Sequence, residues 1–305
     1  MAAQSATGSW REDSGGGGGG EEADNDGLGY ALDAMALVGT CQALEKPFFR
    51  LTAAPDPTRV RPPRVLEQAL AHVKSRWSER NDYEWTADQL KAVRQDLVVQ
   101  HIRTVLTLQV YADHARIALE YGDLNNYAQC AVKVAELTLG PLRLTKSGTD
   151  MGKQEFAQVR AQHMDEFTGY RLLNAFYRNN HTEIGMIMLS LTAVQRAKKV
   201  TKHALEVLSA CNLQNYDAFF RLYSSAPNMS GYIMDFLLTR QRCAAWRMMV
   251  KAYSPTLPLS FVQFTLAFSD ESSCEEFVES VRGGLRPPEE GKPRLIDTHE
   301  SRLCI

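Results

Sequence analysis

The feature that most constrains the fold of this chain is a helical spacing of apolar residues across residues 65–253. Apolar side chains recur there every three or four positions, as on a helix with one buried face. The strict alternation that marks a half-buried strand is nearly absent. The clearest series is Tyr127, Cys130, Ala131, Val134 and Leu137. The pattern predicts a mainly α protein.

Capping and breaking residues divide this region into helices. Asp88 is a candidate N-cap for a helix over residues 89–119, which Gly122 and Asp123 end. The apolar positions of that helix cover more than one stripe, so we expect neighbours on two of its sides. A polar loop is expected over residues 140–154. Later helices are expected over residues 156–177, 183–191, 200–211 and 216–223, and from residue 229 onward.

A weak internal repeat relates two of the predicted helix ends. The pair AL at 118–119 is followed by LNNY at 124–127, and the pair VL at 207–208 is followed by LQNY at 213–216. The shared order of helix end, connecting residues and next helix is typical of stacked helical hairpins. We therefore expect a TPR-like repeat stack over residues 65–254.

The N-terminal flank of the helical region has a different composition. Residues 1–40 are acidic and glycine-rich, and they hold too little apolar surface to offset the entropy of ordering. This segment is expected to be a disordered tail. Residues 41–64 are rich in proline, which removes backbone donors and disfavours helix at the preceding residue, so an extended lead-in is expected.

The C-terminal flank, residues 255–305, is expected to form a winged-helix-like unit. An apolar segment at 257–268 and a helix at 270–281 precede a small hairpin of residues 294–297 and 301–303. Two helices followed by two short strands is the order of elements found in a winged helix.

No motif in the chain indicates bond chemistry. The six cysteines are scattered without a CxxC pair, which argues against a zinc or thioredoxin-type site. The pairs Asp113–His114 and Asp165–Glu166 are helix neighbours that point in different directions, so neither is a catalytic dyad. Nucleophile, phosphate-loop and metal-ligand motifs are missing. We expect a protein that is not an enzyme and uses no cofactor or metal.

Hydropathy and the N-terminal sequence bear on location. No run approaches the roughly 20 apolar residues that span a bilayer, and the first residues lack the basic start and apolar stretch of a secretory signal. We expect no membrane partner and a cytosolic or nuclear location.

Two basic clusters are candidate nucleic-acid contacts, expected to be phosphate-directed and salt-sensitive. The first is expected on the arc of one helix, opposite apolar positions 200, 204 and 207, with His203 on the same arc; it consists of Arg196, Lys198, Lys199 and Lys202. The second surrounds Trp246, whose ring can stack on a base; it consists of Arg240, Arg242, Arg247 and Lys251. The plainer alternative is a solvated helix face in each case, with Trp246 packed in the core.

Several longer segments resemble one known family. They are 48–52 (FFRLT) with 54–57 (APDP), 88–91 (DQLK) with 94–97 (RQDL) and 100–103 (QHIR), 114–120 (HARIALE), 166–173 (EFTGYRLL), the residues Asn215, Tyr216, Phe219, Phe220, Leu222 and Tyr223, 226–229 (APNM), 266–268 (LAF), and 296–298 (IDT). Together they resemble the PCI module of proteasome-lid, signalosome and initiation-factor subunits. They are more similar to the GANP-type mRNA-export family, in particular to the leukocyte receptor cluster member eight branch.

The resemblance implies a helical repeat followed by a winged helix, in a nuclear scaffold of mRNA processing and export coupled to transcription; a cytoplasmic fraction is also compatible with it. It further implies a second PCI-module protein and a small acidic Dss-type protein as partners, with single-stranded RNA as a further candidate. This chain departs from the pattern in the loop at 140–154 and in the acidic helix at 270–281, which would repel phosphate. The alternative is a lid, signalosome or initiation-factor type subunit that contacts only protein.

Overall fold

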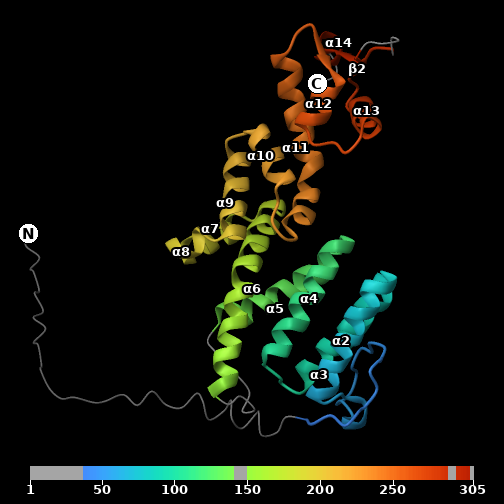
Figure 1. Cartoon of the computed structure of the whole chain (residues 1–305), viewed down its shortest axis with the longest axis vertical. Helices are drawn as coiled ribbons and strands as arrows, with labels where there is room; N and C mark the ends of the chain where they lie inside the picture. The colour runs from blue at the N-terminus through green and yellow to red at the C-terminus, as the bar shows by residue number, and fades with distance from the viewer. Residues whose placement is uncertain (1–36, 141–149, 288–292, 303–305) are drawn as a thin grey trace, which may run out of the picture. The chain divides into compact units, whose positions relative to one another are not determined.

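The computed structural model describes residues 37–140, 150–287 and 293–302, and it is mainly α-helical as predicted (Figure 1). Most helices pack against the next helix along the chain, which is the arrangement of stacked hairpins. The helices are α2 (Pro63–Arg80), α3 (Tyr83–Val99), α4 (Val105–Tyr121), α5 (Leu124–Leu139), α6 (Asp150–Tyr177), α7 (His181–Ser190), α8 (Ala193–Arg196), α9 (Lys199–Asn212), α10 (Tyr216–Ser224), α11 (Ser230–Ala252), α12 (Leu259–Thr265), α13 (Glu271–Ser280) and α14 (Thr298–Arg302). A 3-10 turn, η1 (Pro57–Arg59), precedes them, and the strands are β1 (Thr256–Pro258), β2 (Gly284–Leu285) and β3 (Leu295–Asp297).

Several turns between consecutive helices share one local structure. A residue with positive φ ends the first helix, and the Asp or Asn after it caps the next. Between α4 and α5, Gly122 has a φ of 88°, a conformation that glycine adopts without a Cβ clash. The carboxylate of Asp123 then accepts two backbone N–H groups of α5, at 3.0 and 2.9 Å. The corresponding pairs are Asn81–Asp82, Asn179–Asn180 and Gln214–Asn215.

The backbone hydrogen bonds of these turns are also shared. In three of them the capping residue donates its N–H to the carbonyl five positions earlier, as in a Schellman motif. The donor–acceptor pairs are Asp123–Ala118 at 2.7 Å, Asn180–Ala175 at 2.8 Å and Asn215–Ala210 at 2.8 Å. The internal repeat predicted at 118–127 and 207–216 corresponds to two of these three turns.

Helix α4 packs on two sides, as its apolar pattern predicted. One face joins a large buried cluster that includes residues of α5, α6, α9 and α11, and Leu108 and Ala115 lie in it. The other face, with Val110 and Ile117, joins a smaller cluster formed with α2 and α3. The same helix therefore connects the first hairpin to the rest of the stack.

The single helix predicted over residues 89–119 is wrong in its extent. Asp82, rather than Asp88, caps α3, and a turn with His101 at a φ of 52° separates α3 from α4. The break escaped the sequence pattern because apolar spacing continues through it and neither glycine nor proline marks it.

Parts of three predictions lie outside the described residues. They are residues 1–36 of the predicted tail, residues 141–149 of the predicted loop, and residues 288–292 and 303–305 of the predicted C-terminal unit. Residues 150–154 of that loop belong to α6, so the loop ends earlier than predicted.

The C-terminal unit contains an antiparallel sheet of order β1–β3–β2. In sequence, α12 and α13 lie between β1 and β2, and the central strand places Ile296 opposite Leu257 of β1 and Leu285 of β2. Ile296 and Leu257 are buried, so this small sheet has an apolar centre. Helix α11 contacts both α6 of the stack and α14 of this unit.

The predicted hairpin of residues 294–297 and 301–303 is wrong. The first half of the predicted hairpin forms β3, which pairs with β1 and β2. The described residues after β3 form α14. Asp297 accounts for the change of direction, because its carboxylate accepts the N–H groups of His299 and Glu300 at 2.9 and 3.2 Å. These bonds begin a helix.

The shared turn predicts the effect of removing one cap. Asp123→Ala deletes the acceptor of two α5 amides and of the Tyr83 hydroxyl, which lies at 2.8 Å. We expect the free energy of unfolding to fall by about 2 kcal/mol, measured by urea denaturation. Asp217→Ala removes only an exposed ion pair with Arg221 and should change it by less than about 0.5 kcal/mol. Equal effects of the two variants would contradict the proposed role of the turn.

A buried histidine in α4 predicts a pH dependence. His114 is fully buried with neither ring nitrogen hydrogen-bonded among the described residues. Burial, together with the charges of Arg94 and Lys91, lowers the pKa of His114 from 6.5 to about 3. Below pH 6.5 the unfolded chain therefore takes up a proton that the folded chain does not.

The stability that neutral His114 preserves is fully present above pH 6.5 and declines as the pH falls below it. This residue alone should lower the free energy of unfolding by about 2 kcal/mol on going from neutral pH to about pH 5. Urea denaturation at both pH values should show a smaller decline for His114→Asn than for the natural chain. An identical decline would show that His114 is not the responsible group.

Candidate functional site

The first basic cluster does not lie on a single helix as predicted. Helix α8 ends at Arg196, and a short break that includes Lys198 separates it from α9. Asp165 of α6 holds the start of α9, because its carboxylate accepts the N–H groups of Val200 at 3.2 Å and Thr201 at 3.0 Å. A helix N-terminus is a common phosphate site, but here a carboxylate of the chain itself occupies it.

Two residues of this stretch have structural contacts. The guanidinium of Arg196 donates to the carbonyls of Met188 at 2.6 Å and Leu191 at 3.3 Å, and so satisfies acceptors at the end of α7. His203, expected on the exposed arc, is instead buried, and its Nε2 lies 2.9 Å from the carbonyl oxygen of Leu222. That placement was wrong because position 203 lies three residues after Val200 and four before Val207, which puts it on the buried stripe of α9.

The three lysines of the cluster are more open. Lys199 and Lys202 are exposed, and Lys198 is half-buried at the N-cap of α9. Lys202 lies 3.8 Å from Glu206, one turn further along the helix, which is a solvent-screened pair. These lysines are the part of the first cluster that remains available to an anionic partner.

Arg242 of the second cluster stabilises the C-terminal unit. Its guanidinium donates to the carbonyls of Leu266 at 3.1 Å and Ala267 at 2.7 Å, at the end of α12. The same group lies 3.7 Å from the centre of the Phe268 ring, a cation–π contact. Arg242 is therefore committed to joining α11 to α12.

Arg240 also has partners within the stack. It donates to the side-chain oxygen of Asn179 at 3.1 Å and lies 5.2 Å from the centre of the Phe176 ring. The Asn179 contact ties α11 to the turn between α6 and α7.

Trp246 belongs to the core, in agreement with the plainer interpretation. Its side chain is 1% exposed and packs edge-to-face against Phe277, with ring centres 6.3 Å apart. The ring is therefore closed to a nucleic-acid base. Arg247 and Lys251 are exposed and lie one turn apart on α11.

The acidic helix of the C-terminal unit is present as predicted. Asp270 caps α13 by accepting the N–H of Ser273 at 2.7 Å, and Glu276 and Glu279 are exposed. Glu275 is paired with Arg294. The exposed side of α13 therefore carries carboxylates.

The carboxylate of Glu166 is part of a polar network within the stack. The guanidinium of Arg116 in α4 donates to both oxygens of Glu166 in α6, at 2.9 and 2.7 Å. The Tyr170 hydroxyl donates to Glu166 at 2.9 Å and accepts the N–H of Met229, at the start of α11, at 2.8 Å. Despite its burial, these contacts lower the pKa of Glu166. The network joins three helices.

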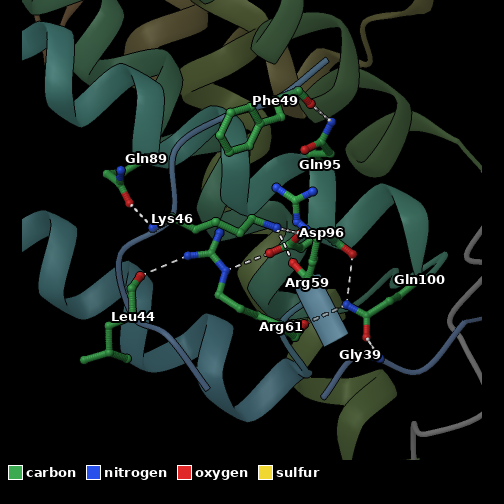
Figure 2. Close-up of polar contacts among 10 residues, drawn as sticks. All are labelled: Gly39, Leu44, Lys46, Phe49, Arg59, Arg61, Gln89, Gln95, Asp96 and Gln100. Atoms are coloured by element: carbon green, nitrogen blue, oxygen red, sulfur yellow. Dashed lines mark hydrogen bonds and ion pairs between the residues drawn. The ribbon is translucent and has the colours of Figure 1, made fainter. Parts of the chain in front are cut away.

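A buried ion cluster that sequence reasoning missed holds the Pro-rich segment against α3 (Figure 2). The carboxylate of Asp96 in α3 is paired with Arg61, at 2.7 Å, and with Lys46. The side chains of Arg61 and Asp96 are 0% and 1% exposed. Lys46 further donates to the carbonyl of Arg59 at 2.8 Å. We call this cluster of Lys46, Arg61 and Asp96 the Asp96 clamp.

Backbone contacts extend the Asp96 clamp along the segment. Arg61 donates to the carbonyl of Leu44 at 2.9 Å, and Gln100 donates to the carbonyl of Arg61 at 2.8 Å. The side-chain oxygen of Gln100 accepts the N–H of Gly39 at 3.0 Å. The segment predicted as an extended lead-in is thus fixed to α3 at several points, as Figure 2 shows.

One signal in the sequence could have identified this clamp. Gln89, Asp96 and Gln100 fall with Val93 on one stripe of α3, and all are buried. Polar side chains at buried helix positions require partners, and a neighbouring segment with Lys46 and Arg61 can supply them.

Among the described residues, no group of three or more His, Cys, Asp or Glu side chains is placed to hold a metal ion. In the same part of the chain, no helix combines the length and the apolar character needed to cross a bilayer.

Comparison with known proteins identifies relatives. The model of the SAC3/GANP family matches residues 46–285. The chain is 39% identical over 246 residues to the leukocyte receptor cluster member 8 homolog of Xenopus laevis, covering 81% of this chain and 28% of that protein. It is 39% identical over 246 residues to the THP3 homolog of Schizosaccharomyces pombe, covering 80% and 58%. It is 39% identical over 242 residues to SAC3 family protein A of Arabidopsis thaliana, covering 79% and 22%.

These matches confirm the predicted family resemblance. They also show that the chain spans less than two thirds of the length of each of these relatives.

The Asp96 clamp predicts a large loss of stability when its anion is removed. Asp96→Asn leaves Arg61 as a buried cation without a counter-charge, which should lower the free energy of unfolding by about 3 to 5 kcal/mol. Urea denaturation measures this change, and limited proteolysis should show faster cleavage within residues 39–61. Glu67→Gln, at an exposed position of α2, is the control and should have little effect. A loss below about 1 kcal/mol would contradict the role of the clamp.

Proposed function

This chain belongs to the SAC3/GANP family, and on that ground we propose that it is a non-enzymatic scaffold in nuclear mRNA processing and export, coupled to transcription. The observation that carries the proposal is the family match over residues 46–285, which includes the helical hairpins and α12 and α13 of the C-terminal unit. A cytoplasmic fraction is compatible with this role.

The proposed partners are a second protein with the same module and a small acidic protein of the Dss type. In this proposal the C-terminal unit is a winged helix, and it completes a PCI module that pairs with the PCI module of the other protein. The order β1, α12, α13, β2, β3 and the antiparallel sheet β1–β3–β2 support the winged-helix assignment.

The proposed RNA contact is made by exposed lysine and arginine side chains and not by a recognition helix. Lys199 and Lys202 at the start of α9, and Arg247 and Lys251 on α11, are exposed cations on the helical stack. Cations at such positions bind phosphates and do not read base sequence. Helix α13 is excluded from this contact by the exposed carboxylates on it, which repel phosphate.

A second candidate function is a subunit of the proteasome-lid, signalosome or initiation-factor type that contacts only protein. Two observations favour it. Asp165 already occupies the N-terminus of α9, where a phosphate would otherwise bind, and α13 is acidic.

An RNA titration distinguishes the two functions. We expect labelled single-stranded RNA to bind the full chain together with a Dss-type protein, and binding to weaken steeply with salt. The variant with Lys198, Lys199 and Lys202 all replaced by Gln should bind roughly tenfold more weakly. The slope of its plot of log affinity against log salt concentration should be smaller in magnitude by about 2. Each of the three lost phosphate contacts would otherwise release about 0.7 counterions.

The matched control removes the same charge elsewhere. Replacing Arg64, Lys74 and Arg80 of α2 by Gln should leave RNA affinity within about twofold, since α2 carries none of the proposed contacts. Equal losses of RNA affinity in the two triple variants would show that RNA binds by general charge attraction and not at a defined site. No RNA binding at low or at high salt would favour the function with protein contacts alone.

A further inference from the structure

The segment FFRL at residues 48–51 exposes large apolar side chains although its backbone is firmly held. Phe48 is 40%, Phe49 52% and Leu51 47% exposed. Apolar residues in a loosely attached segment would be expected to turn inward or to move freely. Here neither description fits, as the contacts of the backbone show.

Polar contacts from α3 fix this backbone. The N–H of Phe48 donates to the Asp88 carboxylate at 3.2 and 3.3 Å, and Gln95 donates to the carbonyl of Phe49 at 2.8 Å. Figure 2 shows Gln95 reaching this carbonyl, beside the Asp96 clamp that anchors Lys46. The segment is thus attached through its polar groups, which leaves its apolar side chains at the surface.

Two of these side chains, Phe48 and Leu51, border a groove with a largely apolar lining. The groove has a volume of about 580 Å³ and lies between Phe48 and Leu51 on one side and α3 and α5 on the other. Val98 of α3 and Val132 of α5 also line it, and they are 55% and 71% exposed. We call this surface the FFRL groove.

All charged side chains that line the FFRL groove are basic. They are Lys91, Arg94 and Lys133. Arg94 lies 5.5 Å from the Tyr111 ring centre, and Lys133 is paired at 2.8 Å with Glu136, one turn along α5. The groove therefore combines aliphatic side chains with a surplus of positive charge.

We propose that the FFRL groove binds an acidic peptide segment of a partner protein, with aliphatic or aromatic anchor residues between its carboxylates. The anchors would pack on Leu51, Val98 and Val132, and the carboxylates would face Lys91, Arg94 and Lys133. The most exposed apolar side chains of the lining, Val132 and Val98, are aliphatic and favour peptide side chains over nucleotides. Of the two rings in the lining, Phe48 is 40% exposed and Tyr111 is buried. This surface is independent of the proposed RNA contact on α9.

Selection from a random peptide library displayed on phage tests the proposal directly. The full chain is the immobilised target, and the peptides that enrich should be acidic with interspersed Leu, Ile, Phe or Trp. An enriched peptide is then synthesised with a fluorescent label, and its affinity for the full chain is measured by anisotropy. Binding should weaken as the salt concentration rises.

Two pairs of variants locate the binding site. Leu51→Ser with Val132→Ser, and separately Lys91→Glu with Lys133→Glu, should each lower the affinity at least tenfold. The matched controls are Leu189→Ser with Val194→Ser, at exposed apolar positions of α7 and α8, and Lys199→Glu with Lys202→Glu. The controls should change the affinity by less than twofold. Circular dichroism melting confirms that every variant is folded.

Several results would overturn the proposal. One is a selection that enriches no peptide, or only peptides without acidic residues. Another is equal affinity in the groove variants and the controls. A third is that a labelled oligouridylate binds the full chain and loses its affinity in the groove variants, which would assign the groove to RNA.

Discussion

The path of the chain depends on a two-residue turn in which a positive-φ residue is followed by an Asp or Asn cap. This turn ends one helix with a Schellman hydrogen bond and starts the next with a side-chain acceptor. The chain therefore changes direction while backbone groups at both helix ends keep hydrogen-bond partners. Its recurrence at Asp123, Asn180 and Asn215 lets successive helices lie against one another. Each helix can then bury its apolar face only on its neighbours, which is why the stack forms as a unit.

Burial inside the stack also decides which residues are available for function. Trp246, Arg242 and His203 carry groups that often bind ligands, yet each is committed to packing or to a backbone carbonyl. The exposed candidates include the lysines at the start of α9, Arg247 and Lys251 of α11, and the FFRL groove beside the Asp96 clamp. We propose these as surfaces for other macromolecules. The buried ion pairs have a different role, because Arg116–Glu166 joins α4 to α6 and Arg61–Asp96 holds the Pro-rich segment against α3.

Helical periodicity was enough to predict the fold class and most helices, because each apolar face must find a neighbour. It did not separate α3 from α4, since the apolar spacing continues across the turn at His101. The exposed arc predicted for α9 also misplaced His203, because position 203 lies about one turn from both Val200 and Val207 and so belongs to the buried stripe. The Asp96 clamp could not be predicted from any single segment, because its three charged side chains are distant in sequence and meet only after α3 has formed.

Hydrogen exchange of the full chain, alone and in the complex in which it is purified from cells, tests the central claim most directly. That claim is a preformed helical stack that binds through its surface. Amides of α4, α5, α6 and α9 should exchange slowly in both states, and added protection should appear at exposed segments such as 48–51 or the start of α9. Slow exchange of these helices only in the complex would contradict it, because the stack would then form only on binding.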